Sequence, residues 1–190
     1  MDTCWLHNVR LEQGYVEEDG LLRTVTQAVN IRIEDGKFAE IVPCAPQEGA
    51  IDGQGRLLLP ALKENHIHID KTYYGGKWIS CAKGKDLLGR LEEEKVLLPE
   101  LLKTMPERTR KIIEMLQRNG HAHIRGYCNV DPIIGIQNYL CAKQILEEYK
   151  GRLTYELAAF PQHGLLRSDT VPYMRQAMEQ GADVVGLTDP

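Results

Sequence analysis

The pattern of this 190-residue chain changes within the stretch Leu57-Leu-Leu-Pro-Ala-Leu-Lys-Glu-Asn-His-Ile-His-Ile-Asp70. Before this stretch, short runs of alternating apolar and polar residues are separated by turns, which is typical of β-strands. After it, predicted strands and helices alternate, which is typical of a parallel sheet covered by helices. Residues 65–70, at the end of the stretch, are predicted to form the first strand of that sheet.

The residues before the stretch predict a small β-sandwich subdomain over residues 1–57. Alternating runs cover residues 29–33 and 38–42. Asp35-Gly36 lies between them and favours a hairpin turn, because glycine accepts the positive φ that such turns require. Residues 51–59 predict a further turn and a buried strand.

The residues after the stretch predict three helices and three more strands. Residues 71–103 are expected to form a long charged connection, in which residues 83–103 are a solvated helix and connector. The first helix of the sheet layer is expected to begin after it, at a capping box formed by Thr104 and Glu107, and to stop at Gly120. The other two helices are expected over residues 133–151 and 170–180, and the strands over residues 122–129, 153–160 and 182–187.

This order of elements predicts an α/β fold, the N-terminal part of a (β/α)8 TIM barrel with about four strands. Such a barrel typically needs ~250 residues, so residues 58–190 would form its first half. A doubly wound open sheet would fit the same order. Its first strand-to-helix turn would lack the glycine-rich phosphate fingerprint, however, so that fold would be without its usual function.

Composition and charge narrow the class of partner. Hydrophobic residues make up 43% and charged residues 26% of the chain, as in globular proteins. The net charge of −4 gives no basic field, so we expect a small-molecule ligand, with no nucleic acid and no membrane. The five cysteines form no Cys-x-x-Cys pair, and the amino terminus lacks a secretory signal, so we expect a cytoplasmic protein.

The first strand after the stretch carries the candidate metal ligands. In His66-Ile-His-Ile-Asp70 the strand period of two places His66, His68 and Asp70 on one face and both isoleucines on the other. On a barrel strand the histidines would face the axis, where two neutral imidazole nitrogens can share one divalent ion. Zinc and iron(II) suit such ligands about equally. A chance histidine pair on an exposed strand is the alternative.

The same spacing recurs in His121-Ala-His123, at the beginning of the second predicted strand. Active sites of barrels gather at the carboxyl ends of the strands. We therefore interpret this second pair as structural.

The stretch from Leu57 to Asp70, placed after a small β subdomain, resembles the first barrel strand of the metal-dependent amidohydrolase superfamily. Ala61 stands where that family usually has glycine. The segment Ala159-Phe-Pro-Gln-His-Gly164 narrows the resemblance to the cytosine-deaminase-like branch. Gln162 matches the glutamine that binds the amide edge of the pyrimidine, and His163 replaces an acidic residue, so both are candidate substrate-binding residues.

The resemblance implies hydrolytic deamination of cytosine or a related amino-heterocycle by metal-activated water, with one zinc or iron ion as cofactor. Those deaminases carry Arg-Thr-His on the second strand, where this chain has Arg125-Gly-Tyr127, which weakens cytosine itself as the substrate. The family's third histidine, acid/base glutamate and late aspartate are expected beyond Pro190. The catalytic residues are therefore unknown, and the chain alone is expected to be incomplete.

Four residues near predicted strand ends could substitute for the missing ligands: His163, Asp70, Asp131 and Asp189. A half barrel also leaves open sheet edges, which favour association, so a homo-oligomer is a further expectation.

Two alternatives to the deaminase remain open. Cyclic-amide hydrolases of the dihydroorotase or hydantoinase type share the His-x-His strand but use a modified lysine on the fourth strand. Residues 183–190 contain no lysine, which favours the deaminase branch. The other alternative is a catalytically inactive truncated fragment.

Overall fold

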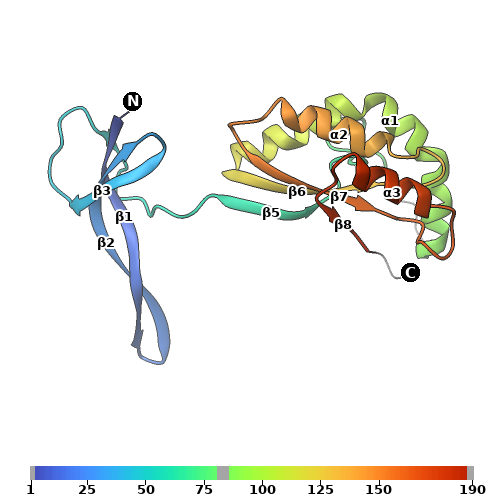
Figure 1. The fold of residues 1–190 in the computed structure, drawn as a ribbon. Coiled ribbons are helices and arrows are strands. Elements are labelled where there is room, and N and C mark those ends of the chain that lie inside the picture. Colours follow the sequence, from blue (N-terminus) through green and yellow to red (C-terminus); the bar gives the residue numbers. More distant parts are fainter. Residues whose placement is uncertain (1–2, 81–85, 188–190) are drawn as a thin grey trace. The chain divides into compact units, whose positions relative to one another are not determined.

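The computed structural model of the chain describes residues 3–80 and 86–187. The chain divides into two compact units, Met1–Pro60 and Ala61–Pro190. In the described residues, the first unit contains strands only, and the second contains strands and helices (Figure 1). None of the described helices is both long and apolar enough to cross a membrane.

The first unit is a sheet in the order β3-β2-β1-β4. β1 and β2 form one long antiparallel ladder, β3 pairs antiparallel with β2, and β4 pairs parallel with β1. The described residues of this unit form a single sheet, so the second sheet that a sandwich needs is not found among them. The strands are β1 (Thr3–Glu18), β2 (Leu21–Glu34), β3 (Lys37–Pro43) and β4 (Ile51–Asp52).

The predicted hairpin turn is confirmed between β2 and β3. Asp35 and Gly36 have φ angles of 50° and 75°. Positive φ at both central residues is the geometry that matches the twist of a two-residue hairpin, and it explains the glycine.

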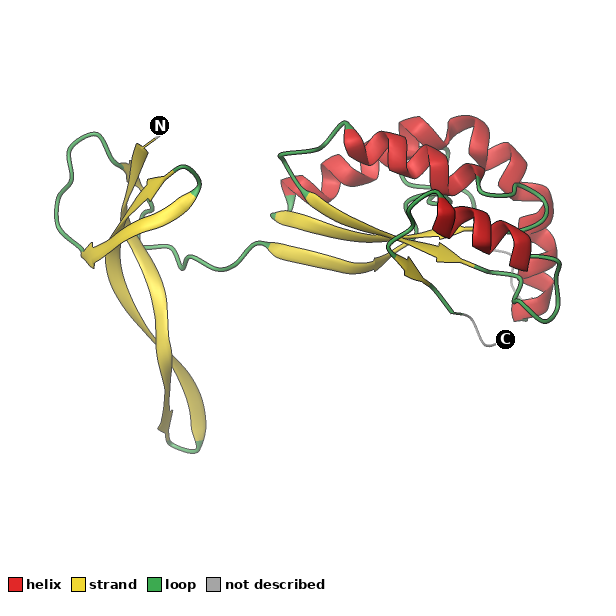
Figure 2. Ribbon diagram, in the orientation of Figure 1, coloured by secondary structure: helices red, strands yellow, loops and turns green. Residues whose placement is uncertain are grey.

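The second unit is a parallel sheet in the order β5-β6-β7-β8, and its strands alternate with helices as the sequence predicts. The helices lie along one face of the sheet (Figure 2). The strands are β5 (Leu62–Ile67), β6 (His121–Asn129), β7 (Thr154–Phe160) and β8 (Val184–Val185), and the helices are α1 (Leu87–Arg118), α2 (Gln137–Glu147) and α3 (Val171–Glu179).

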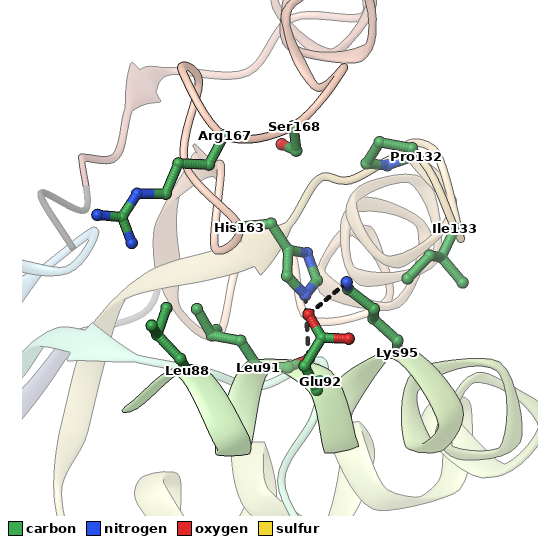
Figure 3. Close-up of a pocket in the computed structure, with 9 residues that line it drawn as sticks. All are labelled: Leu88, Leu91, Glu92, Lys95, Pro132, Ile133, His163, Arg167 and Ser168. Atoms are coloured by element: carbon green, nitrogen blue, oxygen red, sulfur yellow. Dashed lines mark hydrogen bonds and ion pairs between the residues drawn. The ribbon is translucent and has the colours of Figure 1, made fainter. Parts of the chain in front are cut away.

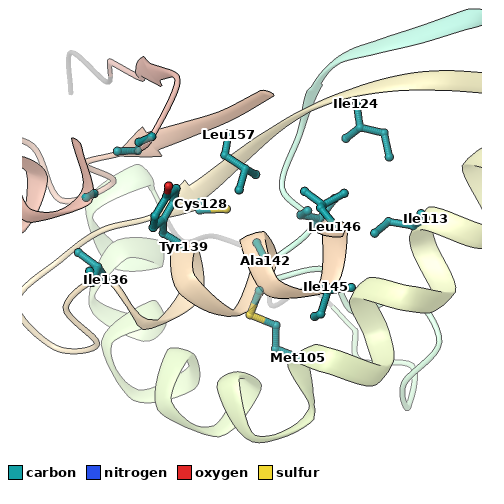
Figure 4. Close-up of a cluster of buried hydrophobic side chains, with 14 of the residues drawn as sticks. Met105, Ile113, Ile124, Cys128, Ile136, Tyr139, Ala142, Ile145, Leu146 and Leu157 are labelled. Atoms are coloured by element: carbon teal, nitrogen blue, oxygen red, sulfur yellow. The ribbon is translucent and has the colours of Figure 1, made fainter. Parts of the chain in front are cut away.

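The core of the second unit lies between this sheet and the helices (Figure 4). Ile124 of β6 and Leu157 of β7 contribute from the sheet, and Ile113 of α1 and Leu146 of α2 contribute from the helices; each is at most 1% exposed. Burial of one such side chain contributes about 1.5–3 kcal/mol. The apolar face of each strand is thereby fixed toward the helices.

The predicted start of the first helix was wrong. The helix begins at Leu87, where Asp86 caps it by accepting a hydrogen bond from the Gly89 main-chain N–H at 2.8 Å. Thr104 lies inside the helix, and its hydroxyl accepts a hydrogen bond from Arg108 Nε at 3.1 Å instead of capping. The capping-box spacing of Thr104 and Glu107 therefore occurs within a continuous helix and does not mark where that helix begins.

The physical reason for this difference is burial. Pro99 and Pro106 lie within α1, and proline normally interrupts a helix because it lacks an N–H. Leu98 and Met105, which precede these prolines, are 1% and 0% exposed. Tertiary packing of this part of the helix thus outweighs the local preference to end it.

Asp70 ties the carboxyl end of β5 to the rest of the unit. Its side chain is buried, and its Oδ2 accepts hydrogen bonds from the Asn129 main-chain N–H and from Asn138 Nδ2, both at 2.8 Å. Asn129 ends β6 and Asn138 lies in the first turn of α2. Asp70, which the sequence predicts on the same face as the histidines, therefore uses its Oδ2 to hold β5, β6 and α2 together.

Replacing Asp70 is expected to destabilise the second unit. Asp70→Ala leaves two buried donors without an acceptor and should lower the free energy of unfolding by roughly 2–5 kcal/mol. Asp70→Asn keeps an oxygen in the same place and should lose less than half as much. Chemical denaturation followed by helical circular dichroism measures both values, because all described helices belong to this unit. Equal losses in the two variants would contradict the role of the Oδ2 acceptor.

Candidate metal and substrate site

Side chains of the parallel sheet alternate between the helix-covered face and a face over which no described helix lies (Figure 2), named here the open face. Ile67 and Ile69 pack with the helix-covered core, so His66 and His68 point to the open face. The same alternation places four further side chains on this face: Arg125 and Tyr127 of β6, and Glu156 and Phe160 of β7.

The two histidine rings lie close together on the open face. Their centroids are 5.8 Å apart, with the rings inclined at 69°. His66 stacks on Tyr127 at 4.1 Å and 14°, and His68 contacts the edge of Phe160 at 5.1 Å. The sequence placed both imidazoles on one face, and the structure brings them together there.

The donor chemistry of this pair fits a divalent metal. Burial lowers the pKa of His68, which favours the neutral imidazole that binds metals. Its Nδ1 is buried and has no hydrogen-bond partner among the described residues. Within the same part of the chain, no group of three or more histidine, cysteine or acidic side chains could hold an ion. The pair thus offers two donors, and a catalytic zinc site generally uses three.

Gln162 lies just beyond the carboxyl end of β7 and is held in place by Lys71. The Lys71 ammonium donates to Gln162 Oε1 at 3.0 Å and to both carboxylate oxygens of Glu94, at 3.0 and 3.2 Å. Because Lys71 occupies the carbonyl of Gln162, the amide N–H groups of Gln162 are the donors left for other partners.

Sequence reasoning missed Lys71 and Glu94. Lys71 directly follows the His-x-His-x-Asp run at the strand end, and that position was the available signal. Glu94 gave none, because it belongs to the charged part of α1 that was predicted to be a solvated helix and connector.

His163 takes a different position from Gln162. The residue is 8% exposed, and its Nε2 lies 3.3 Å from the Leu91 main-chain oxygen of α1. It lines a cavity of about 390 Å³ beside α1 (Figure 3), and His66, His68 and Gln162 are not among the described residues around that cavity. A substrate contact of His163 stays a prediction.

The remaining candidates have structural partners or are not described. Asp131 is buried and accepts hydrogen bonds from the main-chain N–H groups of Ile133 and Ile134, at 2.8 and 3.2 Å. Asp189 lies outside the described residues. His121 begins β6, as predicted, and its Nδ1 lies 3.1 Å from the Leu116 main-chain oxygen.

His123 also lies near the beginning of β6, and its Nδ1 is 2.9 Å from the hydroxyl of Thr154. Arg125, one step further along the strand, pairs with Glu156 at 2.6 Å, and this hydrogen bond raises the pKa of Arg125. The open face therefore carries polar pairs near the amino ends of the strands and aromatic rings near the carboxyl ends.

The Lys71–Glu94 pair should be energetically coupled. Its side chains are 16% and 26% exposed, so solvent screens it less than a surface pair. A double-mutant cycle of Lys71→Met and Glu94→Gln should give a coupling of about 1 kcal/mol in the free energy of unfolding. The exposed Lys103–Glu100 pair of α1 is the control and should give roughly 0.3 kcal/mol. Additive effects at Lys71 and Glu94 would contradict the coupling.

Known proteins share sequence or fold with this chain. No protein-family model matches the chain. It is 37% identical over 193 residues to the uncharacterized protein YahJ of Escherichia coli (strain K12), covering 98% of this chain and 42% of that protein.

Solved structures share the fold. N-isopropylammelide isopropylaminohydrolase from Burkholderia multivorans ATCC 17616 has a TM-score of 0.78 at 26% identity, over 98% of this chain and 45% of that one. A 5-methylcytosine deaminase from Klebsiella pneumoniae, liganded with phosphonocytosine, has a TM-score of 0.73 at 27% identity, over 96% and 43%. Guanine deaminase from C. acetobutylicum shares the fold alone, with a TM-score of 0.60 at 14% identity, over 100% and 46%.

The chain spans less than half the length of each of these proteins. Sequence and structure agree: the solved structures that the chain matches are deaminases and hydrolases of the amidohydrolase superfamily, and the match is consistent with the amino-terminal half of a cytosine-deaminase-like enzyme.

Proposed function

We propose that the chain forms the first half of a (β/α)8 barrel that hydrolytically deaminates cytosine or a related amino-heterocycle. The observation that carries this proposal is the joint position of His66 and His68 on the open face, at the carboxyl end of β5. In a closed barrel, the face opposite the helices becomes the interior. The histidine pair would then lie at the axis, where barrel enzymes hold their metals and substrates.

In the proposed enzyme, His66 and His68 supply two neutral nitrogen ligands to one zinc or iron(II) ion. When bound, such an ion lowers the pKa of a water molecule and orients the substrate. The remaining ligands and the acid/base glutamate would come from the part of the relatives that this chain does not cover. Asp70 keeps β5 in register, so that both imidazoles stay on the axis side.

Gln162 is the proposed substrate-binding residue. Lys71 holds its carbonyl oxygen, so the side-chain amide would donate a hydrogen bond to a carbonyl or an unprotonated nitrogen of the heterocycle. In the reaction, the oxygen of water bonds to the ring carbon, the exocyclic carbon–nitrogen bond breaks, and the amine leaves with a proton. The net change converts an aminoheterocycle and water into the oxo-heterocycle and the free amine.

The solved relatives support this class of substrate. One is named for the removal of isopropylamine from N-isopropylammelide and another for the deamination of 5-methylcytosine. A binuclear site of the cyclic-amide hydrolase type gains no support, because β8 and its neighbours, residues 182–187, contain no lysine for a metal bridge.

The test is amine release from cytosine, 5-methylcytosine and N-isopropylammelide with zinc or iron(II). The chain is assayed alone and joined to the remaining part of the Escherichia coli relative. The joined protein should release amine, and His66→Ala or His68→Ala should lower kcat/KM at least ~100-fold, because metal assistance contributes several kcal/mol.

His123→Ala is the matched control, since this histidine lies near the opposite end of its strand, and it should retain activity. A metal-loaded joined protein that is silent on all three compounds, or equally active without His66, would refute the proposal.

A further inference from the structure

Four aromatic rings on the open face form a closed set of contacts. His66 stacks on Tyr127 with centroids 4.1 Å apart, Tyr127 contacts Phe160 at 5.8 Å, Phe160 contacts His68 at 5.1 Å, and His68 contacts His66 at 5.8 Å. Only the His66–Tyr127 contact is face to face; the other three meet edge to face. His66 thus stacks on Tyr127, whereas His68 contacts the edge-on ring of Phe160 and, at 6.0 Å and 55°, the tilted ring of Tyr127.

The two benzene rings are themselves held by the sheet. Gly186, which follows β8, lies against them: a Cβ there would be 2.7 Å from Phe160 Cδ2 and 3.2 Å from Tyr127 Cδ1. Tyr127 also faces the small side chain of Ala158 across the β6–β7 ladder, which leaves room for its ring. The backbone at Gly186 and the small neighbour Ala158, both on the β7–β8 side of β6, therefore bound the space that the ring of Tyr127 occupies on that side.

His66 has no comparable support of its own. Its side chain is exposed at the uncovered edge strand β5, and its ring contacts are those with Tyr127 and His68. An exposed imidazole on an edge strand can adopt several rotamers, and each one lost on binding weakens the affinity for a metal. The near-parallel stack on Tyr127 removes this freedom before an ion arrives.

We propose that Tyr127 is a positioning residue for the metal ligand His66, acting through the face of its aromatic ring. This inference rests on the proposed function, because it takes His66 and His68 as metal ligands. It adds that the ring plane of His66 is set by its neighbour on β6. The phenol hydroxyl is not needed for this role, whereas the aromatic face is.

The test is the affinity of the chain for zinc, measured by competition with a chromophoric chelator. Tyr127→Phe keeps the ring and should bind zinc within about twofold of the unchanged chain. Tyr127→Leu and Tyr127→Met keep apolar volume without a flat face and should bind ~10–100-fold more weakly, the range seen when groups that orient a metal ligand are lost. Tyr155→Leu, on the opposite face of β7, is the control and should bind normally.

Two further readouts separate positioning from general damage. The visible spectrum of the cobalt(II)-loaded chain reports ligand geometry and should change in Tyr127→Leu but not in Tyr127→Phe. In a His66→Ala background, Tyr127→Leu should cause a much smaller loss of zinc affinity than in the unchanged chain, because the stacked ligand is already gone and only the looser, tilted contact with His68 remains.

Each outcome bears on a different claim. If His66→Ala lowers zinc affinity but Tyr127→Leu and Tyr127→Met do not, the positioning role is wrong and the metal assignment stands. An equal loss from Tyr127→Leu with and without His66 would also overturn the positioning role. If His66→Ala leaves zinc affinity unchanged, the metal assignment fails and the inference falls with it.

Discussion

The alternation of side chains along β5 is the constraint on which the candidate site depends. Ile69 is buried in the helix-covered core and Ile67 packs partly buried against it, and this packing forces His66 and His68 to the opposite face. A slip of the strand by one residue would bury both imidazoles in the apolar core and expose both isoleucines. The free energy that packs the sheet against its helices therefore also orients the candidate metal ligands.

Buried polar contacts at the carboxyl ends of the strands hold this arrangement in register. Asp70 joins the end of β5 to Asn129 and Asn138, and Lys71 joins it to Glu94 of α1 and to Gln162. Two adjacent residues thus serve two purposes, since the first fixes the strand and the second fixes the residue proposed to bind substrate.

The sequence predicted those features that depend on local pattern. The parallel strands, the Asp35-Gly36 hairpin, the helix end near Gly120 and the shared face of the histidines follow from periodicity and from glycine conformation. Features set by distant packing were missed. The first half of α1 contains Pro99, and its continuation into one packed helix depends on the burial of Leu91 and Leu98, which the local sequence does not reveal. Because that half was predicted to be a solvated helix and connector, its Glu94 was not placed beside Lys71.

X-ray absorption at the zinc edge, on the chain loaded with one equivalent of zinc, tests the central claim most directly. We expect scattering from two imidazole nitrogens at about 2.0–2.1 Å, the usual zinc–histidine distance. This contribution should fall to one imidazole in His66→Ala and in His68→Ala. An imidazole count that neither substitution changes would contradict the claim that this pair on the open face holds the metal.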